Sequence, residues 1–238
     1  MLESLKNKRI LVVVAHPDDE LLGLGATMNM LITSYGVKAK SVILGEGITS
    51  RGSKRDVTQW EATLKRHKEN LVNAQKAIGY QSFSTYDFPD NRFDGVDLLD
   101  IVKAVEAEKE DFKPDVIFTH HGGDTNIDHQ KTFEAVITAS RPIQGEQVQT
   151  IITFETPSST EWQAFNYKNY FAPNLFIEVD ERSLEQKVKG MQCYEYEKRA
   201  YPHPRSPEAL KVLAKKRGVE VGVQYAEAFM LIRNIARI

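Results

Sequence analysis

Histidine and aspartate gather in two short stretches of this sequence, residues 16–19 and residues 120–129. Four of the six histidines and four aspartates fall there: His16, His120, His121, His129, Asp18, Asp19, Asp124 and Asp128. Imidazole and carboxylate groups are ligands that zinc takes in proteins. This density of ligand atoms predicts a metal site, provided that the fold brings the two stretches together.

Two imidazoles and one carboxylate leave at least one position on a zinc ion open, which is the pattern of a catalytic site. Zinc lowers the pKa of a bound water to about 7 and polarises a carbonyl oxygen. A neighbouring carboxylate can take the proton of that water and pass it to a leaving nitrogen. Because Asp18 and Asp19 are adjacent, their side chains point in different directions. The spacing favours Asp19 and His16 converging on one ion, with Asp18 facing the water.

The elements around the two stretches explain how they can meet. Ile10–Ala15 is uniformly apolar and rich in β-branched residues, which is typical of a central strand buried on both faces of a parallel sheet. Val116–Thr119 predicts a second such strand, followed by a loop over His120–Asp128. Loops that leave the carboxyl ends of parallel strands share one edge of the sheet, so we expect the two stretches to lie side by side there.

The first two thirds of the chain alternate strands and helices, which predicts a doubly wound, mostly parallel sheet. We expect strands at Ala39–Leu44, Ser84–Phe88 and Thr150–Phe154 and helices at Leu21–Ser34, Thr58–Ile78, Val96–Glu110 and Asp128–Ser140. The C-terminal part is less regular. It predicts a strand at Asn174–Val179, a helix at Glu181–Ala200, a Pro-rich loop at Pro202–Pro207, a helix capped by Ser206 and an apolar end near Phe229–Ile232. Since no linker or repeat interrupts the chain, residues 1–238 are expected to form one domain.

Composition excludes several classes of protein. The 238 residues are 41% hydrophobic and 27% charged with a formal net charge of -2, so the sequence predicts an ordinary globular protein without a broad basic face for nucleic acid or anionic lipid. Cys193 is the only cysteine, which excludes an intrachain disulfide and favours a reducing compartment. The apolar run Ile10–Ala15 is too short for a secretory signal or a membrane span, so we expect a cytoplasmic protein.

The sequence Ala15–Glu20 (AHPDDE) and the later Asp128-His129 resemble the two signatures of the LmbE/PIG-L family of zinc-dependent N-deacetylases. Most of the chain takes part in the resemblance, because three further segments are similar to family landmarks: the Gly-rich loop through Arg51, the turn Pro89–Arg92 and the segment Tyr225–Phe229. The resemblance implies a Rossmann-like fold, a zinc cofactor and a homo-oligomer. Zinc is not the only candidate, since sites of this ligand type also accept ions such as Fe²⁺.

The resemblance also implies a role for individual residues. By it, His16, Asp19 and His129 are the metal ligands and Asp18 is the general base. Two further positions, Arg51 and Asp90, are implied to bind hydroxyl groups of an amino-sugar substrate. An ion pair between these two residues that only braces their loops is the alternative.

One position departs from the family pattern. The family commonly has a histidine three residues before the last ligand, where it polarises the acyl carbonyl, whereas this chain has Asn126. Asn126 can donate a neutral hydrogen bond in its place, or the electrophile can come from His120, His121 or His203. His121 and His203 are also candidates for substrate contact. Asp128 is expected to serve catalysis by orienting a ligating imidazole.

The first hypothesis for function is removal of an N-acetyl group from an N-acetylglucosamine-type glycoside or conjugate. An amidase for a different N-acyl group is the second. A metal-containing sugar-binding protein without turnover is the third, supported by Asn126 and opposed by Asp18, because a binding protein has no need of a general base.

Three other features have simpler explanations. His67 lies in a charged helical stretch and is expected to be solvated. Gly23-Leu24-Gly25 is a weak dinucleotide fingerprint, because it lies inside the predicted helix and lacks the third glycine. Pro157–Pro173 is polar and aromatic, which predicts a substrate-facing or interface loop.

Overall fold

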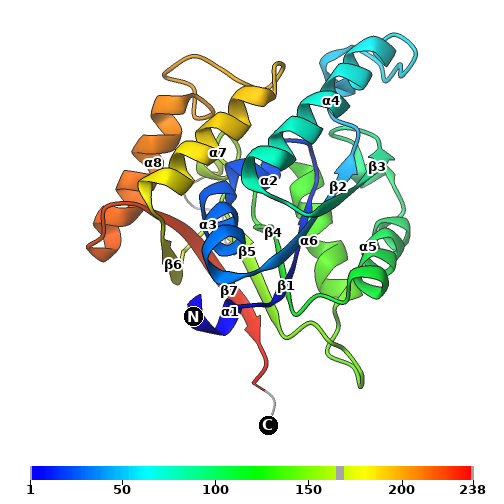
Figure 1. Cartoon of the computed structure of the whole chain (residues 1–238). Coiled ribbons are helices and arrows are strands. Elements are labelled where there is room, and N and C mark those ends of the chain that lie inside the picture. The colour runs from blue at the N-terminus through cyan, green and yellow to red at the C-terminus, as the bar shows by residue number, and fades with distance from the viewer. Residues whose placement is uncertain (1, 165–168, 237–238) are drawn as a thin grey trace.

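The computed structural model describes residues 2–164 and 169–236 of the chain (Figure 1). The strands of this part are β1 (Arg9–Val14), β2 (Lys38–Gly45), β3 (Ser82–Phe88), β4 (Val116–His120), β5 (Thr150–Phe154), β6 (Leu175–Glu178) and β7 (Ala226–Asn234). Its α-helices are α1 (Leu2–Leu5), α2 (Asp19–Leu22), α3 (Gly25–Tyr35), α4 (Glu61–Ile78), α5 (Leu98–Phe112), α6 (Ile127–Ala139), α7 (Glu181–Cys193) and α8 (Pro207–Val221). Short 3₁₀ turns lie at Thr49–Arg51, Phe93–Gly95 and Thr160–Trp162.

The strands form one sheet in the order β3-β2-β1-β4-β5-β7-β6. The first five strands in that order are parallel, and β7 runs antiparallel to both β5 and β6. The chain winds from β1 outward to β3 and then returns to place β4 on the other side of β1. This arrangement confirms the predicted doubly wound, mostly parallel sheet in a single α/β domain.

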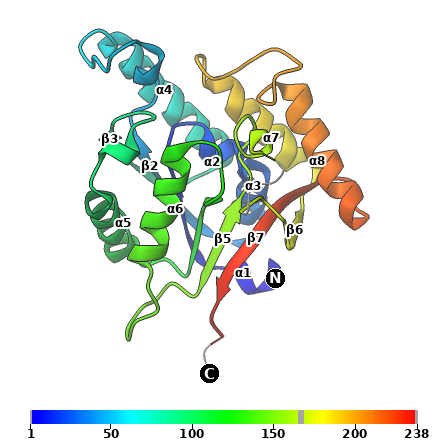
Figure 2. The same cartoon turned by 180° about the vertical axis from the view of Figure 1, so that it is seen from behind.

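Helices cover both faces of the sheet. Helices α3, α4 and α7 cover the face nearer the viewer in Figure 1, and α5 and α6 cover the opposite face, which Figure 2 turns toward the viewer. Strand β1 is buried from Ile10 to Val14 and contributes alternate residues to the two cores, Ile10, Val12 and Val14 to one and Leu11 and Val13 to the other. The alternation of side chains along a strand explains why the whole run is apolar.

The predicted helix Leu21–Ser34 is in fact two helices, α2 and α3, separated at Gly23 and Leu24. A Cβ atom at position 23 would lie 2.1 Å from the ring of Phe154, so the glycine lets that ring of β5 pack against the helix backbone. Helix α3 has no side-chain cap of its own, and Glu227 of β7 accepts from the backbone N–H of Thr27 at 2.7 Å instead. Gly23-Leu24-Gly25 therefore serves helix packing and is not a dinucleotide fingerprint.

The predicted helix Glu181–Ala200 ends early, at Cys193. The next residue, Tyr194, is fully buried, and its hydroxyl donates to Oε1 of Glu20 at 2.6 Å. This contact turns the chain toward the carboxyl edge of the sheet, and residues 194–206 then run as turns to α8. The predicted cap of α8 is confirmed, since the Ser206 hydroxyl accepts from the N–H of Ala209 at 3.1 Å.

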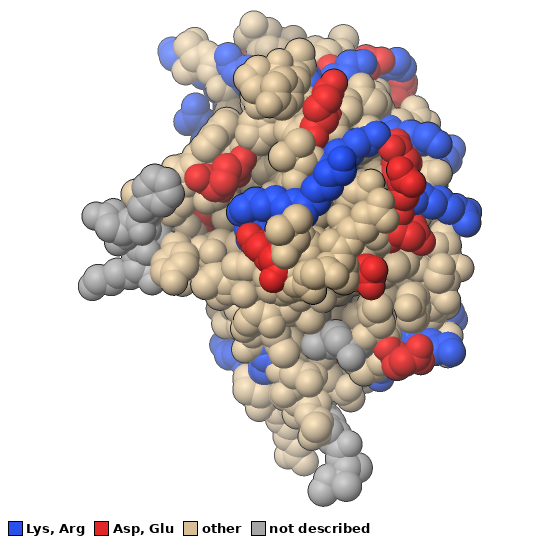
Figure 3. Space-filling model, turned by 90° about the vertical axis from the view of Figure 1, so that its left-hand side faces the viewer, with Lys and Arg blue, Asp and Glu red and all other residues tan. Residues whose placement is uncertain are grey.

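The surface carries charges of both signs. On the face in Figure 3, acidic and basic side chains are interspersed among uncharged ones, and the residues described on that face form no continuous basic surface. Among the described helices, none combines the length and hydropathy that a membrane-spanning helix requires.

Candidate metal and substrate site

The first of the two polar stretches forms a strained turn at the carboxyl end of β1. Asp18 has a φ of 110°, in the left-handed region that non-glycine residues rarely occupy. Its backbone N–H donates to Oε2 of Glu20 at 3.0 Å, and Glu20 also accepts from Gln75 at 2.9 Å. Burial raises the pKa of Glu20 to about 7. These contacts hold the turn in the conformation that presents its side chains at the sheet edge.

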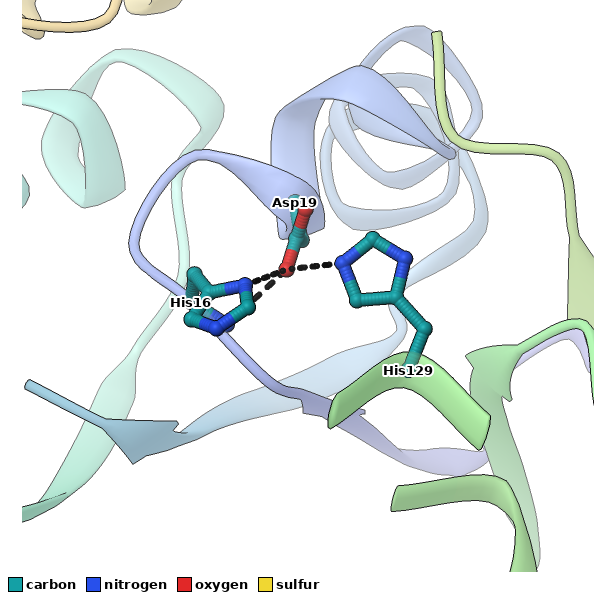
Figure 4. Close-up of side chains that lie close together, drawn as sticks. All are labelled: His16, Asp19 and His129. Atoms are coloured by element: carbon teal, nitrogen blue, oxygen red, sulfur yellow. Dashed lines mark hydrogen bonds and ion pairs between the residues drawn. The ribbon is translucent and has the colours of Figure 1, made fainter. Parts of the chain in front are cut away.

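Three predicted ligands converge at this edge (Figure 4). Oδ2 of Asp19 lies 3.5 Å from Nδ1 of His16 and 3.3 Å from Nε2 of His129, and the figure shows the carboxylate pointing between the two rings. One ligand atom from each residue lies within 4.8 Å of the other two. The topology brings them together because β1 and β4, which precede the two stretches, are neighbours where the winding reverses.

The outer nitrogen of each imidazole faces a carboxylate. Nε2 of His16 lies 2.8 Å from Oδ2 of Asp128, and Nδ1 of His129 lies 3.1 Å from Oδ1 of Asp124. Ligating histidines usually give their second N–H to such an acceptor, which fixes the ring and its tautomer. The pairing leaves Nδ1 of His16 and Nε2 of His129 directed toward Asp19.

The two outer carboxylates are themselves held in place. Asp128 is fully buried and accepts from the backbone N–H of Phe93 at 2.9 Å. Asp124 is also fully buried and accepts from the Ser159 hydroxyl and from the backbone N–H of Asn126 at 2.9 Å. Each imidazole therefore has a fixed carboxylate beside its outer nitrogen, in a hydrogen bond for His16 and in a close ion pair for His129.

The charges of the site suit a divalent cation. Burial lowers the pKa of His129, but the carboxylates of Asp19 and Asp124 outweigh it and raise that pKa to about 9. His129 in turn holds the pKa of the Asp19 carboxyl well below its usual value, against the effect of burial. Hydrogen bonds to Asp128 and Asp19 likewise raise the pKa of His16, against the effect of burial. A metal that binds here would displace such protons. Two nitrogen donors and one oxygen donor fit the ligand preferences of zinc and of several other divalent ions.

His120 lies directly behind the ligands. Its ring stacks on that of His129 with centroids 3.8 Å apart, and its Nε2 accepts the backbone N–H of Ala15 at 3.0 Å. Nδ1 therefore carries the hydrogen and faces Oγ1 of Thr156 at 3.2 Å. Burial lowers the pKa of His120 to about 4, so the ring is neutral. The side chain is fully buried and joins the ends of β1 and β4, which argues against its use as the electrophile.

A pocket of about 280 Å³ opens over these ligands. The loops after β1, β2, β3 and β4 line one part of it, and residues from the segments 158–162 and 197–205 and His67 of α4 line other parts. The predicted site residues that line it are His16, Asp18, Arg51, Asp90, Asn126, His129 and His203. The predicted substrate-facing loop Pro157–Pro173 contributes Ser158, Ser159 and Trp162, while its residues 165–168 lie outside the described part of the chain.

Asn126 caps α6. Its side-chain oxygen accepts from the N–H of Asp128 at 2.8 Å, and its amide nitrogen donates to Oδ1 of Asn91 at 3.0 Å. An amide nitrogen carries two hydrogens, so one remains for another acceptor. Asn126 thus combines a structural role with a free donor on the pocket side.

His121 is not among the described residues that line the pocket, and its Nε2 lies 2.8 Å from the backbone oxygen of Asn169, so a role in substrate contact stays a prediction. Two other sequence predictions need correction. His67 is not solvated but 2% exposed, and it lines the pocket. The predicted alternative of an ion pair between Arg51 and Asp90 is wrong, because Arg51 pairs with Glu197.

Asp90 instead supports the loops beside His16. Its Oδ2 accepts from the backbone N–H of Ser50 at 3.0 Å, and its Oδ1 lies 3.3 Å from Nε2 of His16. These contacts join the loops that follow β2 and β3 at the rim of the pocket. A substrate role for Asp90 therefore stays a prediction.

Sequence reasoning named His203 but missed two other pocket residues of the C-terminal part. Glu197 and Arg205 line the pocket, and Arg205 donates to Oδ2 of Asp18 at 2.8 Å. Neither residue belongs to a motif with a fixed spacing. The only signal in the sequence was a charged residue within a Pro-rich loop, and that pattern does not predict which surface the loop covers.

Comparison with known proteins supports the family resemblance. A family model described as "PIG-L: GlcNAc-PI de-N-acetylase" matches residues 11–140, which is more than half of the chain. The uncharacterized deacetylase YaiS of Escherichia coli (strain K12) is 29% identical over 191 residues, covering 78% of this chain and 90% of that protein. The diacetylchitobiose deacetylase of Thermococcus kodakarensis is 25% identical over 238 residues, covering 96% of this chain and 84% of that protein.

Solved structures with this fold include deacetylases and also an enzyme of another class. GalB of Pseudomonas putida KT2440, a 4-carboxy-2-hydroxymuconate hydratase, matches with a TM-score of 0.73 and 19% identity, covering 97% of this chain and 98% of that one. At such low identity the likeness shows the fold alone. The match of the family model to residues 11–140 identifies this chain as a member of the PIG-L family.

Proposed function

We propose that this protein is a zinc-dependent hydrolase that removes the N-acetyl group from an amino-sugar substrate of the N-acetylglucosamine type. The observation that carries the proposal is the convergence of His16, Asp19 and His129 at a pocket that His16, His129 and Asp18 line. The named activities of relatives support the same chemistry, since one of them is a diacetylchitobiose deacetylase.

The three ligands would hold the ion through two nitrogens and one oxygen, and the bound ion would supply a polarised acyl carbonyl and an acidic water. Asp18 takes a proton from the water as the water oxygen attacks the acyl carbon. The same carboxylic acid then donates that proton to the amide nitrogen as the C–N bond breaks. Acetate and a free amine leave. Asp128 and Asp124 keep the imidazoles oriented through the cycle.

The developing negative charge on the acyl oxygen needs a donor from the protein. Of the four candidates from the sequence, Asn126 and His203 line the pocket, whereas His120 and His121 do not. Asn126 is the residue that we assign to this task, through the amide hydrogen that Asn91 does not use. His203 and Arg51 then remain for hydroxyl groups of the sugar.

The pocket favours a polar substrate. Its lining includes Arg51, Arg199 and Arg205 together with the carboxylates of Asp18, Asp90 and Glu197. Such groups recognise hydroxyls through paired donors and acceptors, and Trp162, which is 58% exposed, offers an aromatic face to a sugar ring. The lone Cys193 supports a reducing, cytoplasmic setting, and assembly into a homo-oligomer remains part of the proposal.

The test is acetate release from a panel of N-acetylated amino sugars, diacetylchitobiose among them, by zinc-loaded protein. Wild type is expected to hydrolyse at least one sugar. Asp18→Asn should bind zinc and be inactive, and His129→Ala should lose zinc. Binding of zinc without hydrolysis of any N-acetylated sugar would overturn the substrate class, and hydrolysis of other N-acyl amides instead would indicate an amidase. Sugar binding without any turnover would indicate a binding protein.

A further inference from the structure

The two oxygens of the Asp18 carboxylate have different surroundings. Oδ2 accepts from Nη1 of Arg205 at 2.8 Å. For Oδ1, no hydrogen bond to any described residue is found, and Asp18 lines the pocket. One oxygen is thus anchored to the protein while the other remains for a water or a substrate.

Arg205 is well placed to be an anchor because two residues besides Asp18 hold its guanidinium. Nη1 donates to Oε2 of Glu197 at 2.7 Å as well as to Asp18, and Nε donates to the Ser158 hydroxyl at 2.8 Å. The Arg205 side chain is only 23% exposed. Glu197 in turn pairs through its other oxygen with Arg51, which also lines the pocket. A planar guanidinium with fixed donors loses little further freedom when it binds a carboxylate.

The turn that carries Asp18 does not fix its carboxylate. Glu20 holds the backbone N–H of Asp18, and the N–H groups of Leu21 and Leu22 bond its carbonyl oxygen. These contacts determine the backbone, whereas the rotation of the carboxylate about its terminal bond is broad unless a partner restricts it. Among the described residues, Arg205 is the partner that restricts it.

We propose that Arg205, held by Glu197, is a positioning residue that fixes the carboxylate of Asp18 so that Oδ1 faces the reacting water. The proposal rests on the proposed function in one respect, that Asp18 is the general base. It adds a task for the C-terminal loop, which no sequence motif connects with the metal ligands. A carboxylate that loses its orientation costs rate rather than affinity, because proton transfer requires correct geometry in the transition state.

The kinetic test compares Arg205→Ala, Arg205→Lys and Glu197→Gln with wild type, all loaded with zinc, on a hydrolysed N-acetylated sugar. Arg205→Ala should lower kcat about 100-fold with little change in KM and unchanged zinc content. Arg205→Lys should retain part of the kcat that Arg205→Ala loses. Guanidinium chloride at millimolar concentration, added to Arg205→Ala, should restore part of it. Arg66→Ala is the control, because Arg66 also pairs with glutamates but lies on the surface of α4, half-exposed.

A second measurement does not depend on activity. In a crystal structure of zinc-loaded Arg205→Ala, the Asp18 carboxylate should occupy more than one orientation while the backbone of residues 16–20 is unchanged. A single, wild-type orientation of Asp18 would overturn the proposal, as would a kcat equal to that of wild type. A rise in KM alone would overturn it too, since Arg205 would then bind substrate. If wild type hydrolyses no amide, the proposed function fails, and the orientation of Asp18 alone decides the role of Arg205.

Discussion

Oδ1 of Asp124 lies 3.1 Å from Nδ1 of His129, the imidazole nitrogen that faces away from Asp19. The carboxylate approaches from the loop that follows β4, in the same segment as the ligand that it orients. The second outer carboxylate belongs to Asp128. Although Asp128 is next to His129 in sequence, its carboxylate contacts the imidazole of His16. Asp128 thus contacts an imidazole of the other chain segment, whereas Asp124 contacts an imidazole of its own.

Replacing Asp124 should weaken metal binding without removing a ligand. We expect Asp124→Asn to lower zinc affinity about 10- to 100-fold, because the amide no longer fixes the imidazole of His129 as an anionic acceptor does. Competition with a chromogenic chelator measures the affinity. Asp94→Asn, at an exposed position, is the control. Equal affinities in Asp124→Asn and wild type would show that this carboxylate does not orient the ligand.

Asn126 should show its two tasks separately. Asn126→Ala removes the cap of α6 and should lower the free energy of unfolding by about 1 kcal/mol. Asn126→Ser keeps a capping oxygen and a neutral side chain, so its stability should stay near that of wild type, but it lacks the amide donor. Its kcat should fall about 100-fold if the amide stabilises the acyl oxygen. Full activity of the serine variant in steady-state assays would point to His203 instead.

His67 should make the protein less stable in acid. Burial lowers the pKa of His67 from 6.5 to about 4, and Nδ1 has no hydrogen-bond partner among the described residues. Between pH 6.5 and about pH 4, the unfolded state binds more protons than the folded state. The contribution of neutral His67 to the free energy of unfolding is therefore complete above pH 6.5. It is lost as the pH falls toward 4, by about 3 kcal/mol at most.

His67→Phe removes this proton-binding group while keeping a ring between Tyr194 and Tyr196, whose centroids lie 5.7 and 6.2 Å away. Urea unfolding at pH 7.5 and 5, with wild type and variant in the same metal state, measures the effect. The variant should lose less stability than wild type between the two pH values. An identical loss in both proteins would show that His67 does not titrate differently on folding.

Glu227 should be needed for the packing of α3. Its carboxylate accepts from the N–H of Thr27 and pairs with Lys187 at 2.6 Å, with both side chains 5% exposed. Glu227→Gln leaves the Lys187 ammonium buried without its counter-charge, which should cost about 3 kcal/mol of unfolding free energy. Glu178→Gln, exposed on the neighbouring β6, is the control.

The double variant Glu227→Gln with Lys187→Met removes both charges. Much of the lost stability should return, because no unpaired buried charge remains. Chemical denaturation of the four proteins completes the cycle. If the double variant were no more stable than Glu227→Gln alone, the loss would come from the cap of α3 rather than from the unpaired ammonium.

The sequence by itself determined the class of fold and the metal ligands that the proposal uses. Alternating apolar segments such as Ile10–Ala15 predict buried parallel strands because each face of a strand must meet a core. Given such a sheet, the short spacing of His16 and Asp19 and the position of His129 after Val116–Thr119 predict their meeting at one edge. These features are local or follow from general rules of topology.

Tertiary structure alone decided which other side chains reach the site. Glu197, Arg205 and His67 come from elements whose local patterns predict a helix, a loop and a solvated face. Helix α7 ends where the buried Tyr194 meets Glu20, a contact between residues 174 positions apart that no local pattern contains. Because that ending sends residues 194–206 over the pocket, Arg205 reaches Asp18 across 187 positions of chain. Such distant pairs depend on how the elements pack, and packing is a property of the whole chain.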